Sequence, residues 1–252
     1  MHMRSVVVAS KSDIRRAAEA FRDAVAELGR YRIVASDNIA TRRPMTDDDG
    51  AILAESVFGF RAPADQWWRN GQLALQSPMA RACRYESQPF WANSDGFRTQ
   101  HQNLYLDGIS LNAFDERSFL HAAIIVPVHL PFGQIGMAAF GATEPERHDL
   151  SQEFEANADQ LMLLTHRFLT SYAQITRRRQ WLPTDIQLTK REVECLRWAA
   201  VGKTDKEISM ILSRSHATVR FHIQNAGAKL DAVNRSQTVF KAAQLGYIGL
   251  AN

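Results

Sequence analysis

Two helix-start signals of the same kind follow each other closely near the C-terminal end of the chain. Thr189 and Glu192 have the spacing of a capping box, in which the threonine caps a helix and the glutamate bonds back to the threonine N–H. Thr204 and Glu207 repeat this pattern. Between the two boxes, Gly202 ends an apolar run at helical spacing, as glycine does at helix ends. This region therefore predicts short, closely spaced helices.

Two further helices are expected after the second box. Ser215 can cap one of them, and a last helix opens at Asn234 or Ser236. Only Ser213 and Arg214 separate the second helix of this series from the third. Two helices joined by so short a turn are typical of a helix-turn-helix.

The third helix has a polar side that suits a DNA major groove. With its apolar residues turned inward, Arg220, Gln224 and Gly227 point outward. Arginine pairs with guanine and glutamine with adenine through two hydrogen bonds each. Other basic residues lie on turns and flanks, where they can meet phosphates: Lys203, Lys206, Lys229 and Arg235. The alternative is a four-helix bundle whose polar face has no partner.

The charge distribution favours the DNA interpretation. Residues 177–252 hold 13 lysines and arginines against 6 acidic residues, a net charge of +7. Residues 1–176 hold 17 against 21, a net charge of −4. A small basic end on a mildly acidic body is typical of a polyanion-binding module joined to another domain.

The segment from Leu188 to Thr204, with the later pairs Thr218-Val219, Lys229-Leu230 and Asn234-Arg235, resembles the LuxR-type DNA-binding domain over residues 185–248. Glu192, Leu196 and Gly202 fall in register with the family motif. The resemblance implies a transcription regulator whose third helix reads operator bases. Together with the helix-turn-helix pattern, the resemblance implies a set of residues that contact DNA. They are Lys203, Ser215, Thr218, Arg220, His222, Gln224, Lys229 and Arg235.

The first 176 residues mix helical and strand patterns. A helix capped by Ser12 is expected over residues 12–28, followed by a strand at 31–35. Apolar, β-prone runs at 121–128 and 135–140 flank a turn and predict a hairpin. The other expected elements are a strand within 51–60, helices at 63–75 and 113–120, and a long helix at 149–177.

The long helix carries a single apolar seam from Phe154 to Ile175. One interpretation is a core helix lying across its own sheet. The other is a helix that also pairs with a second subunit, and the length of the helix, about 40 Å at 1.5 Å per residue, favours it. We therefore expect a homodimer that uses part of this seam.

This N-terminal region resembles the autoinducer-binding domain of quorum-sensing LuxR-type regulators, an α/β/α sandwich that binds an acyl-homoserine lactone. The resemblance rests on the helix-first order, the long final helix and the segment from Ile124 to Gly136. The family's Asp-Pro pair, whose carboxylate accepts the amide N–H of the ligand, is replaced by Ser77-Pro78. An aromatic cluster also suits an apolar small-molecule pocket: Trp67, Trp68, Tyr85, Phe90 and Trp91. The ligand-binding residues expected from the resemblance and from this cluster are Trp68, Ser77, Tyr85, Trp91 and Gly133.

Other functions find little support in the sequence. The chain shows no phosphate-cradling glycine loop, nucleophile elbow or metal-ligand spacing, so no enzyme, metal or cofactor is expected. The acidic run 47–49 is interpreted as a solvated loop rather than a phosphoacceptor. Cys83, beside two arginines, is either a thiol of lowered pKa or, more commonly, a buried structural one.

The sequence thus predicts an α+β protein: an α/β/α sensor and dimerisation domain at 1–176, a linker at 177–187 and an all-α helix-turn-helix domain at 188–252. Neither an export signal nor a membrane span is recognised, so a cytoplasmic protein is expected. The expected function is transcription regulation by double-stranded operator binding in response to a lactone-like apolar signal. A ligand-independent regulator, whose N-terminal domain only dimerises, remains the alternative.

Overall fold

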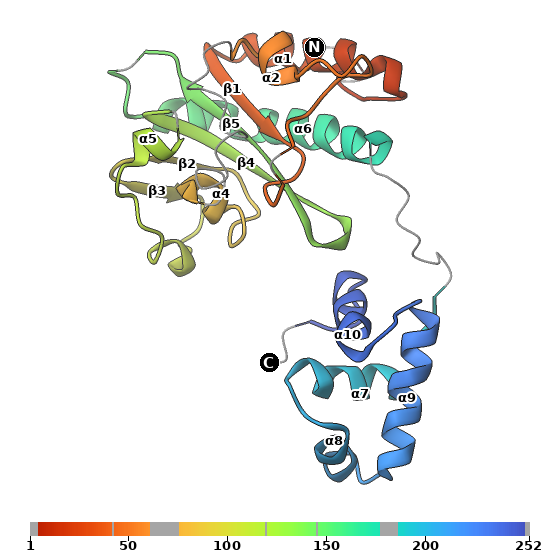
Figure 1. Cartoon of the computed structure of the whole chain (residues 1–252). Coiled ribbons are helices and arrows are strands. Elements are labelled where there is room, and N and C mark those ends of the chain that lie inside the picture. Colours follow the sequence, from red (N-terminus) through yellow and green to blue (C-terminus); the bar gives the residue numbers. More distant parts are fainter. Residues whose placement is uncertain are drawn as a thin grey trace. The chain divides into compact units, whose positions relative to one another are not determined.

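A computed structural model describes residues 5–41, 43–60, 76–118, 120–144, 146–176 and 186–249. The chain divides into two compact units, the first formed mainly by residues before Arg178 and the second mainly by Arg178–Asn252 (Figure 1). The expected helix at 63–75, which includes Trp68, lies outside the described residues. Each unit has hydrophobic clusters of its own.

The described part of the first unit is built on an antiparallel sheet of five strands in the order β1-β5-β4-β2-β3. The predicted hairpin is confirmed, with Phe132 and Gly133 of its turn in the left-handed region at φ 67° and 69°. The predicted first strand is also confirmed, and it pairs with the last. The strands are β1 (Tyr31–Ser36), β2 (Phe90–Asn93), β3 (Gly96–Thr99), β4 (Ala122–Leu130) and β5 (Gln134–Ala142).

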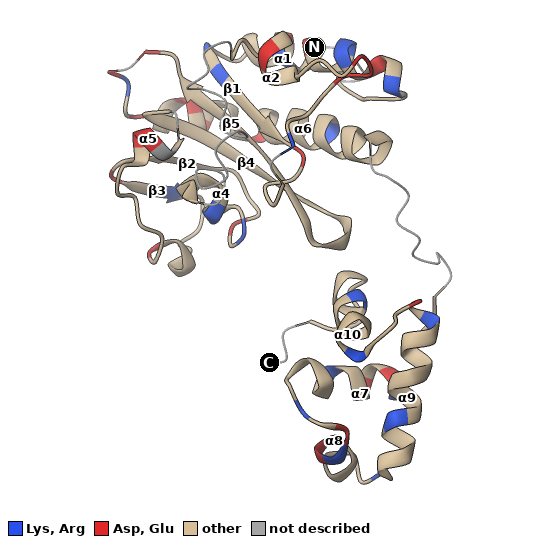
Figure 2. Cartoon of the chain, in the orientation of Figure 1, with Lys and Arg blue, Asp and Glu red and all other residues tan. Residues whose placement is uncertain are grey.

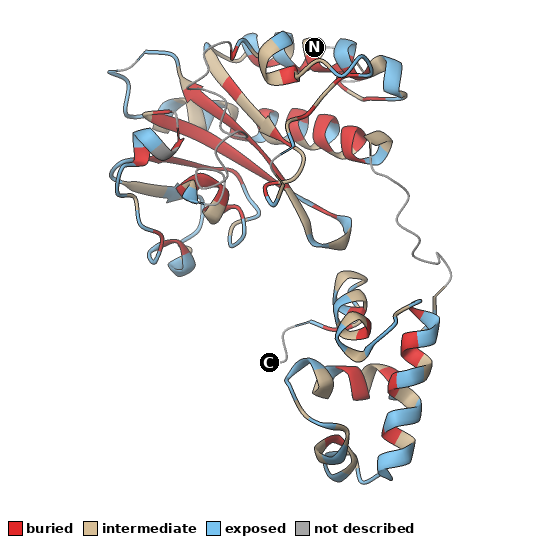
Figure 3. Cartoon of the chain, in the orientation of Figure 1, coloured by how far each residue is buried: buried red, intermediate tan, exposed pale blue. Residues whose placement is uncertain are grey.

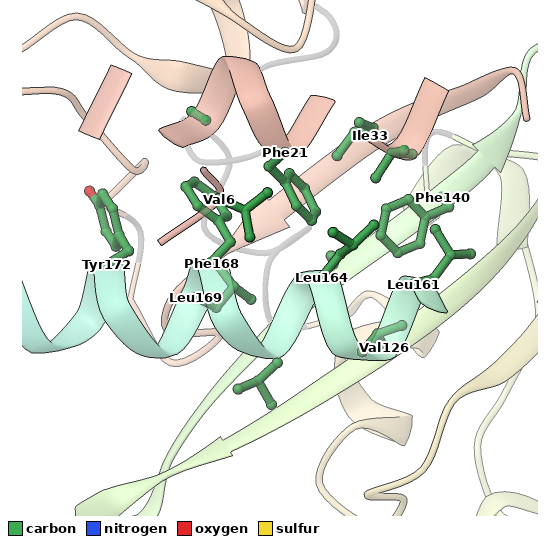
Figure 4. Packing of buried hydrophobic residues seen from close by; sticks show 14 of the residues in the cluster. Val6, Phe21, Ile33, Val126, Phe140, Leu161, Leu164, Phe168, Leu169 and Tyr172 are labelled. Atoms are coloured by element: carbon green, nitrogen blue, oxygen red, sulfur yellow. The ribbon is translucent and has the colours of Figure 1, made fainter. Parts of the chain in front are cut away.

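Large side chains fill one face of this sheet. Helices α1 (Ile14–Ala26) and α6 (Ser151–Thr176) cover that face, and Phe21 of α1 stacks on Phe168 of α6 at 4.9 Å between ring centroids. Figure 4 shows the side chains of α6 directed towards α1 and the sheet, with Phe140 of β5 among them. Burial of these rings removes a large apolar area from water and so stabilises the unit.

The opposite face carries a second buried cluster, in which small and large side chains are mixed. Ala92, Ala123 and Ala139 of three neighbouring strands belong to this cluster. Helices α4 (Pro78–Ala82) and α5 (Phe114–Ser118) contribute Met79 and Phe114 to the same cluster. Because helices lie on both faces, the predicted α/β/α sandwich and the α+β class are confirmed.

Three local expectations are wrong. The segment expected as a strand within 51–60 contains the short helix α2 (Leu53–Ser56), since a turn after Asp47 leaves only an isolated bridge before it. Helix α1 begins at Ile14 after a 3-10 turn, and Ser12 does not cap it. Asp47 is buried rather than solvated, because its carboxylate accepts the N–H of Ala51 at 2.8 Å and lies 3.5 Å from an Arg15 nitrogen.

The middle of the apolar seam of α6 is buried by the chain's own residues. Leu161, Leu164 and Phe168 are fully buried. The sheet is too small to cover the whole stripe, but α1 and the segment before it extend the covered surface, and the Val8 N–H donates to Ser171 Oγ at 2.9 Å. The middle of the seam is therefore covered within the chain, whereas the apolar residues at its two ends are only half-buried. Partial use of the seam by a second subunit stays a prediction.

Residues 186–249, all of which are described, form four helices with two small cores (Figure 3). Both predicted capping boxes are confirmed: Thr189 Oγ1 accepts the N–H of Glu192, and Thr204 Oγ1 accepts that of Glu207. The last helix begins after Asn234, which caps it. The helices are α7 (Lys190–Ala200), α8 (Asp205–Ile211), α9 (His216–Lys229) and α10 (Arg235–Gln244).

Candidate functional site

A tight turn connects α8 to α9. Ser213 adopts the left-handed conformation at φ 50°, and the N–H of Arg214 donates to the carbonyl of Ser209 at 2.9 Å. Ser215 then caps α9, accepting the N–H of Thr218 at 3.0 Å, and the two hydroxyl groups lie 2.8 Å apart. Two residues expected to contact DNA are thus bonded to each other at the start of the third helix, where they also fix its direction.

Helix α9 divides into an inward and an outward side. Val219, Ile223 and Ala226 are buried against α7, α8 and α10. Arg220 and Gln224 are exposed, one turn apart on the same side. These two side chains therefore stand where the sequence predicted, on the outward side of the helix.

Gly227, which was expected to point outward with them, is buried instead. A Cβ atom at this position would lie 3.0 Å from Thr238 Oγ1, which is tighter than ordinary contact. Glycine therefore permits the close approach of α9 to α10. His222 is half-buried on another side of the helix, beside Thr218 and Arg191 at a small pocket.

Two of the expected DNA-contacting cations are held by groups of the chain itself. Lys229 Nζ donates to Glu192 Oε2 at 2.8 Å and to the carbonyl of Gln187 at 3.1 Å. Arg235 Nη2 donates to the carbonyl of Lys203 at 2.6 Å and lies 3.3 Å from Asp205 Oδ1. These contacts join α9 to α7 and α10 to the start of α8.

Glu192 stands at the centre of the first contact and is only 3% exposed. Burial alone would raise the pKa of its carboxyl, but the hydrogen bonds from Lys229 and Thr189 outweigh burial, and the pKa is lowered. The motif residue Leu196 is fully buried in the core beside it. Gly202, the third motif residue, ends α7 at φ +90°, a conformation that favours glycine.

Figure 2 shows where the lysines and arginines of this unit lie along the ribbon, and several of them are exposed. Lys206 and Arg214 are exposed, and Lys203 lies 3.6 Å from Glu207 with both side chains more than 40% exposed. An open groove of about 330 Å³ runs beside α9, between Gln224 and Arg220 on one side and the start of α10 on the other. The outward side of α9 is therefore a polar, cationic edge next to a groove.

In the first unit, the expected ligand-binding residues do not gather at one place. Ser77 caps α4, with its hydroxyl accepting the N–H of Ala80 at 3.4 Å. Tyr85 is 55% exposed and stacks on Tyr105 at 6.0 Å. Gly133 lies in the exposed turn of the β4–β5 hairpin. Of the described set, Ser77 alone lies at the start of α4, which covers the second buried cluster of the sheet.

Trp91 and Phe90 point to opposite faces of the sheet, as neighbours in a strand must. Phe90 packs with Met79 and Cys83 on the α4 side, whereas Trp91 belongs to the cluster under α1 and α6. The sequence analysis placed Phe90 with Trp91 in one aromatic cluster and did not single out Met79 for this face. Strand alternation was the signal that could have separated Phe90 from Trp91.

The described residues offer little catalytic chemistry. They contain no group of three or more His, Cys, Asp and Glu side chains suited to a metal ion. Cys83 is fully buried, and burial raises the pKa of its thiol, which matches the structural interpretation. Among the described helices, none has the length and apolar character needed to cross a bilayer.

Two helices joined by a tight turn, braced by a helix on each side, define the second unit as a helix-turn-helix domain. Residues 186–242 match the family model described as "GerE: Bacterial regulatory proteins, luxR family". This unit is therefore a LuxR-type helix-turn-helix domain, as the sequence predicted.

Relatives of this chain carry names of regulators. This chain is 40% identical over 131 residues to "Transcriptional activator protein VanR" of Vibrio anguillarum, and the match covers 51% of this chain and 52% of VanR. That match is longer than Arg178–Asn252 and so extends into the first unit. This chain is also 55% identical over 64 residues to "HTH-type quorum sensing-dependent transcriptional regulator RpaR" of Rhodopseudomonas palustris, and the match covers 25% of this chain and 26% of RpaR.

The chain spans about half the length of the curated relatives that head this comparison. Among solved structures, the crystal structure of Escherichia coli SdiA in the space group P6522 is similar over 73% of each chain, with 25% identity and a TM-score of 0.40.

Proposed function

We propose that this protein is a DNA-binding transcriptional regulator, not an enzyme, whose α9 reads base edges in the major groove of an operator. The observation that carries the proposal is the outward side of α9, where Arg220 and Gln224 are exposed on a LuxR-type helix-turn-helix domain. Arginine and glutamine each match a base edge with two hydrogen bonds. The named regulators among the relatives support the same conclusion.

Phosphate contacts would come from the cations around α8 and the turn. Lys203, Lys206 and Arg214 are at the surface there. Ser215 and Thr218 can add hydroxyl contacts at the start of α9, and His222 lies further along it. Lys229 and Arg235 remain candidates, although each is held within the domain, so we assign them first to bracing. Such contacts position the domain on the duplex without reading sequence.

We further propose that the first unit binds a small apolar signal of the acyl-homoserine lactone type. The face of the sheet covered by α4 combines Ala92, Ala123 and Ala139 with the ring of Phe90, an apolar lining that suits such a signal. Ser77 caps α4 beside that cluster and keeps a hydroxyl oxygen as acceptor. Phe90 lies on this face, and Tyr85, Trp91, Gly133 and Trp68 remain expectations from the family resemblance.

The regulator is proposed to act as a homodimer that binds two half-sites about one helical turn apart. The middle of the α6 seam is covered within the chain, so its half-buried ends, Phe154 and Ile175, are the part left for a dimer contact. A signal that binds the folded first unit better than its unfolded form stabilises it, and the stabilised dimer then holds both recognition helices. The proposed domain limits are a sensor at 1–176, a linker at 177–187 and the DNA-binding domain at 188–252.

DNA binding is tested by footprinting the full-length protein on the DNA upstream of its own gene and on a random-sequence library. Protected duplex is expected, with affinity falling steeply as salt rises because phosphate contacts release counterions. A variant with Arg220→Ala and Gln224→Ala together serves as the matched control and should lose sequence preference while keeping its melting temperature. A protein that protects no duplex at low salt contradicts the proposal.

Signal binding is tested by thermal melting with a panel of acyl-homoserine lactones. A ligand at about a hundred times its Kd adds roughly 2.7 kcal/mol to the folded state and raises the melting temperature of the first unit. Melting that no lactone changes would favour the ligand-independent regulator. Footprinting without ligand then decides whether DNA binding needs a signal at all.

A further inference from the structure

One large apolar side chain stays exposed on α9, a helix that is described along its whole length. Phe221 is 58% exposed, while the apolar residues Val219 and Ile223 on either side of it in sequence are buried. Its ring meets the neighbouring His222 ring edge-on at 5.9 Å between centroids. The core of the domain therefore gains little from this phenylalanine, and its position on the outward side needs another explanation.

Phe221 lies among the groups proposed to read bases. Residues three and four apart on a helix are neighbours, so Ala217 lies before Phe221 and Gln224 after it on the same side. Ala217, Gln224 and the adjacent Arg220 are all exposed. A cationic, hydrogen-bonding edge of this kind suits DNA rather than an apolar protein surface. If Arg220 and Gln224 enter the major groove of DNA, the Phe221 ring enters the same groove.

The apolar group that the major groove offers to such a ring is the C5-methyl of thymine. We infer that Phe221 recognises a thymine through this methyl group and so adds an apolar specificity contact to the polar ones of Arg220 and Gln224. This inference rests on the proposed DNA-binding function. Its expected size is that of one buried methyl group, which corresponds to about a fourfold change in affinity.

The test removes the methyl group from the DNA and the ring from the protein. Full-length protein, with a stabilising lactone present where the melting panel finds one, first selects its best duplexes from a random library. Each thymine of a selected duplex is then replaced singly by deoxyuridine, which keeps every hydrogen-bonding group and loses only the methyl. Dissociation constants are measured for the wild type, for Phe221→Ala and for Phe240→Ala.

Phe240 provides the matched control, because it is also an exposed phenylalanine, 60% exposed, but lies on α10. At one or two positions, uracil should weaken binding by the wild type and by Phe240→Ala about fourfold. Phe221→Ala should bind the thymine and uracil duplexes equally at those positions. Melting curves confirm that each variant is folded.

Three results overturn the inference. The first is wild-type binding that uracil leaves unchanged at every position, and the second is a Phe221→Ala variant that keeps the full preference for thymine. A loss of thymine preference in Phe240→Ala as large as in Phe221→Ala also contradicts a direct contact. If no duplex is selected, the proposed DNA-binding function fails, and this inference fails with it. Duplexes that are selected but show no thymine preference dependent on Phe221 contradict this inference alone.

Discussion

Helices α6 and α9 both carry an apolar stripe, but they use their remaining surface differently. The stripe of α6 is covered by the sheet, by α1 and by the segment before it. The stripe of α9 is covered by three short helices, and its other side presents Arg220, Phe221 and Gln224 to solvent. The apolar stripe of a helix therefore indicates which side packs against the rest of the domain, while the outward residues of the helix indicate what it can bind.

If α6 is a core helix, truncating its stripe should produce the largest loss of stability. Phe168→Ala should lower the free energy of unfolding of the first unit by about 3–5 kcal/mol, because the ring is fully buried and stacked on Phe21. Urea denaturation followed by near-UV circular dichroism measures it. Leu163→Ala, at a residue of α6 that is 37% exposed, is the control and should cost less than about 1 kcal/mol. Equal losses would contradict the assignment of the stripe.

The brace behind α9 should give the next largest effect. Glu192→Gln should lower the stability of the second unit by about 1–3 kcal/mol, because it removes the charged acceptor of Lys229. Glu194→Gln, which removes the half-buried partner of the exposed Arg191, should change stability little.

The same pair predicts a pH dependence. The lowered pKa of Glu192 means that its stabilising contribution is present above the pKa of an unfolded glutamate and is lost as pH falls through the lowered value. The stability difference between wild type and Glu192→Gln should therefore be constant near neutral pH and narrow below about pH 4.3. Denaturation at a series of pH values measures it. A difference that widens in acid would contradict the ion pair.

The outward side of α9 should affect binding rather than stability. Arg220→Ala should weaken operator binding by about 1–3 kcal/mol and relax base preference at one position, with the melting temperature unchanged. Affinity is measured against duplexes carrying each single base change. Arg197→Ala, at an exposed arginine of α7, should preserve base preference. A uniform loss across all duplexes would make Arg220 a phosphate contact instead.

The smallest expected effect separates exposed cations from braced ones. Lys203→Ala should weaken binding to all sequences alike and reduce the salt slope by about one. Lys229→Ala should leave the salt slope nearly unchanged and lower stability, because Lys229 is engaged by Glu192 and Gln187. Titrations at several salt concentrations give the slopes. An equal change of slope in both variants would show that Lys229 reaches a phosphate after all.

Local patterns in the sequence predicted most elements of the second unit correctly. The capping boxes at Thr189 and Thr204 depend on residues three apart, so short-range spacing was sufficient. Gly227 was misplaced because its environment depends on Thr238, a residue of the next helix. The region at 51–60 was misjudged for a different reason: Leu53, Ala54 and Glu55 of α2 are good helix formers, and only an isolated bridge forms before them.

The sequence by itself determined the hairpin, the helix-turn-helix and the outward position of Arg220 and Gln224, because each follows from spacing within one segment. The division into two units was indicated by the difference in charge between residues 1–176 and 177–252. The tertiary structure decided which stripe is already covered, which cations are engaged and which of two neighbouring aromatics faces α4. Those outcomes depend on contacts between residues far apart in the chain, such as Val8 with Ser171 and Lys229 with Glu192. Periodicity in the sequence predicts on which side of a helix or strand a residue lies, and only the tertiary structure shows which groups pack against that side.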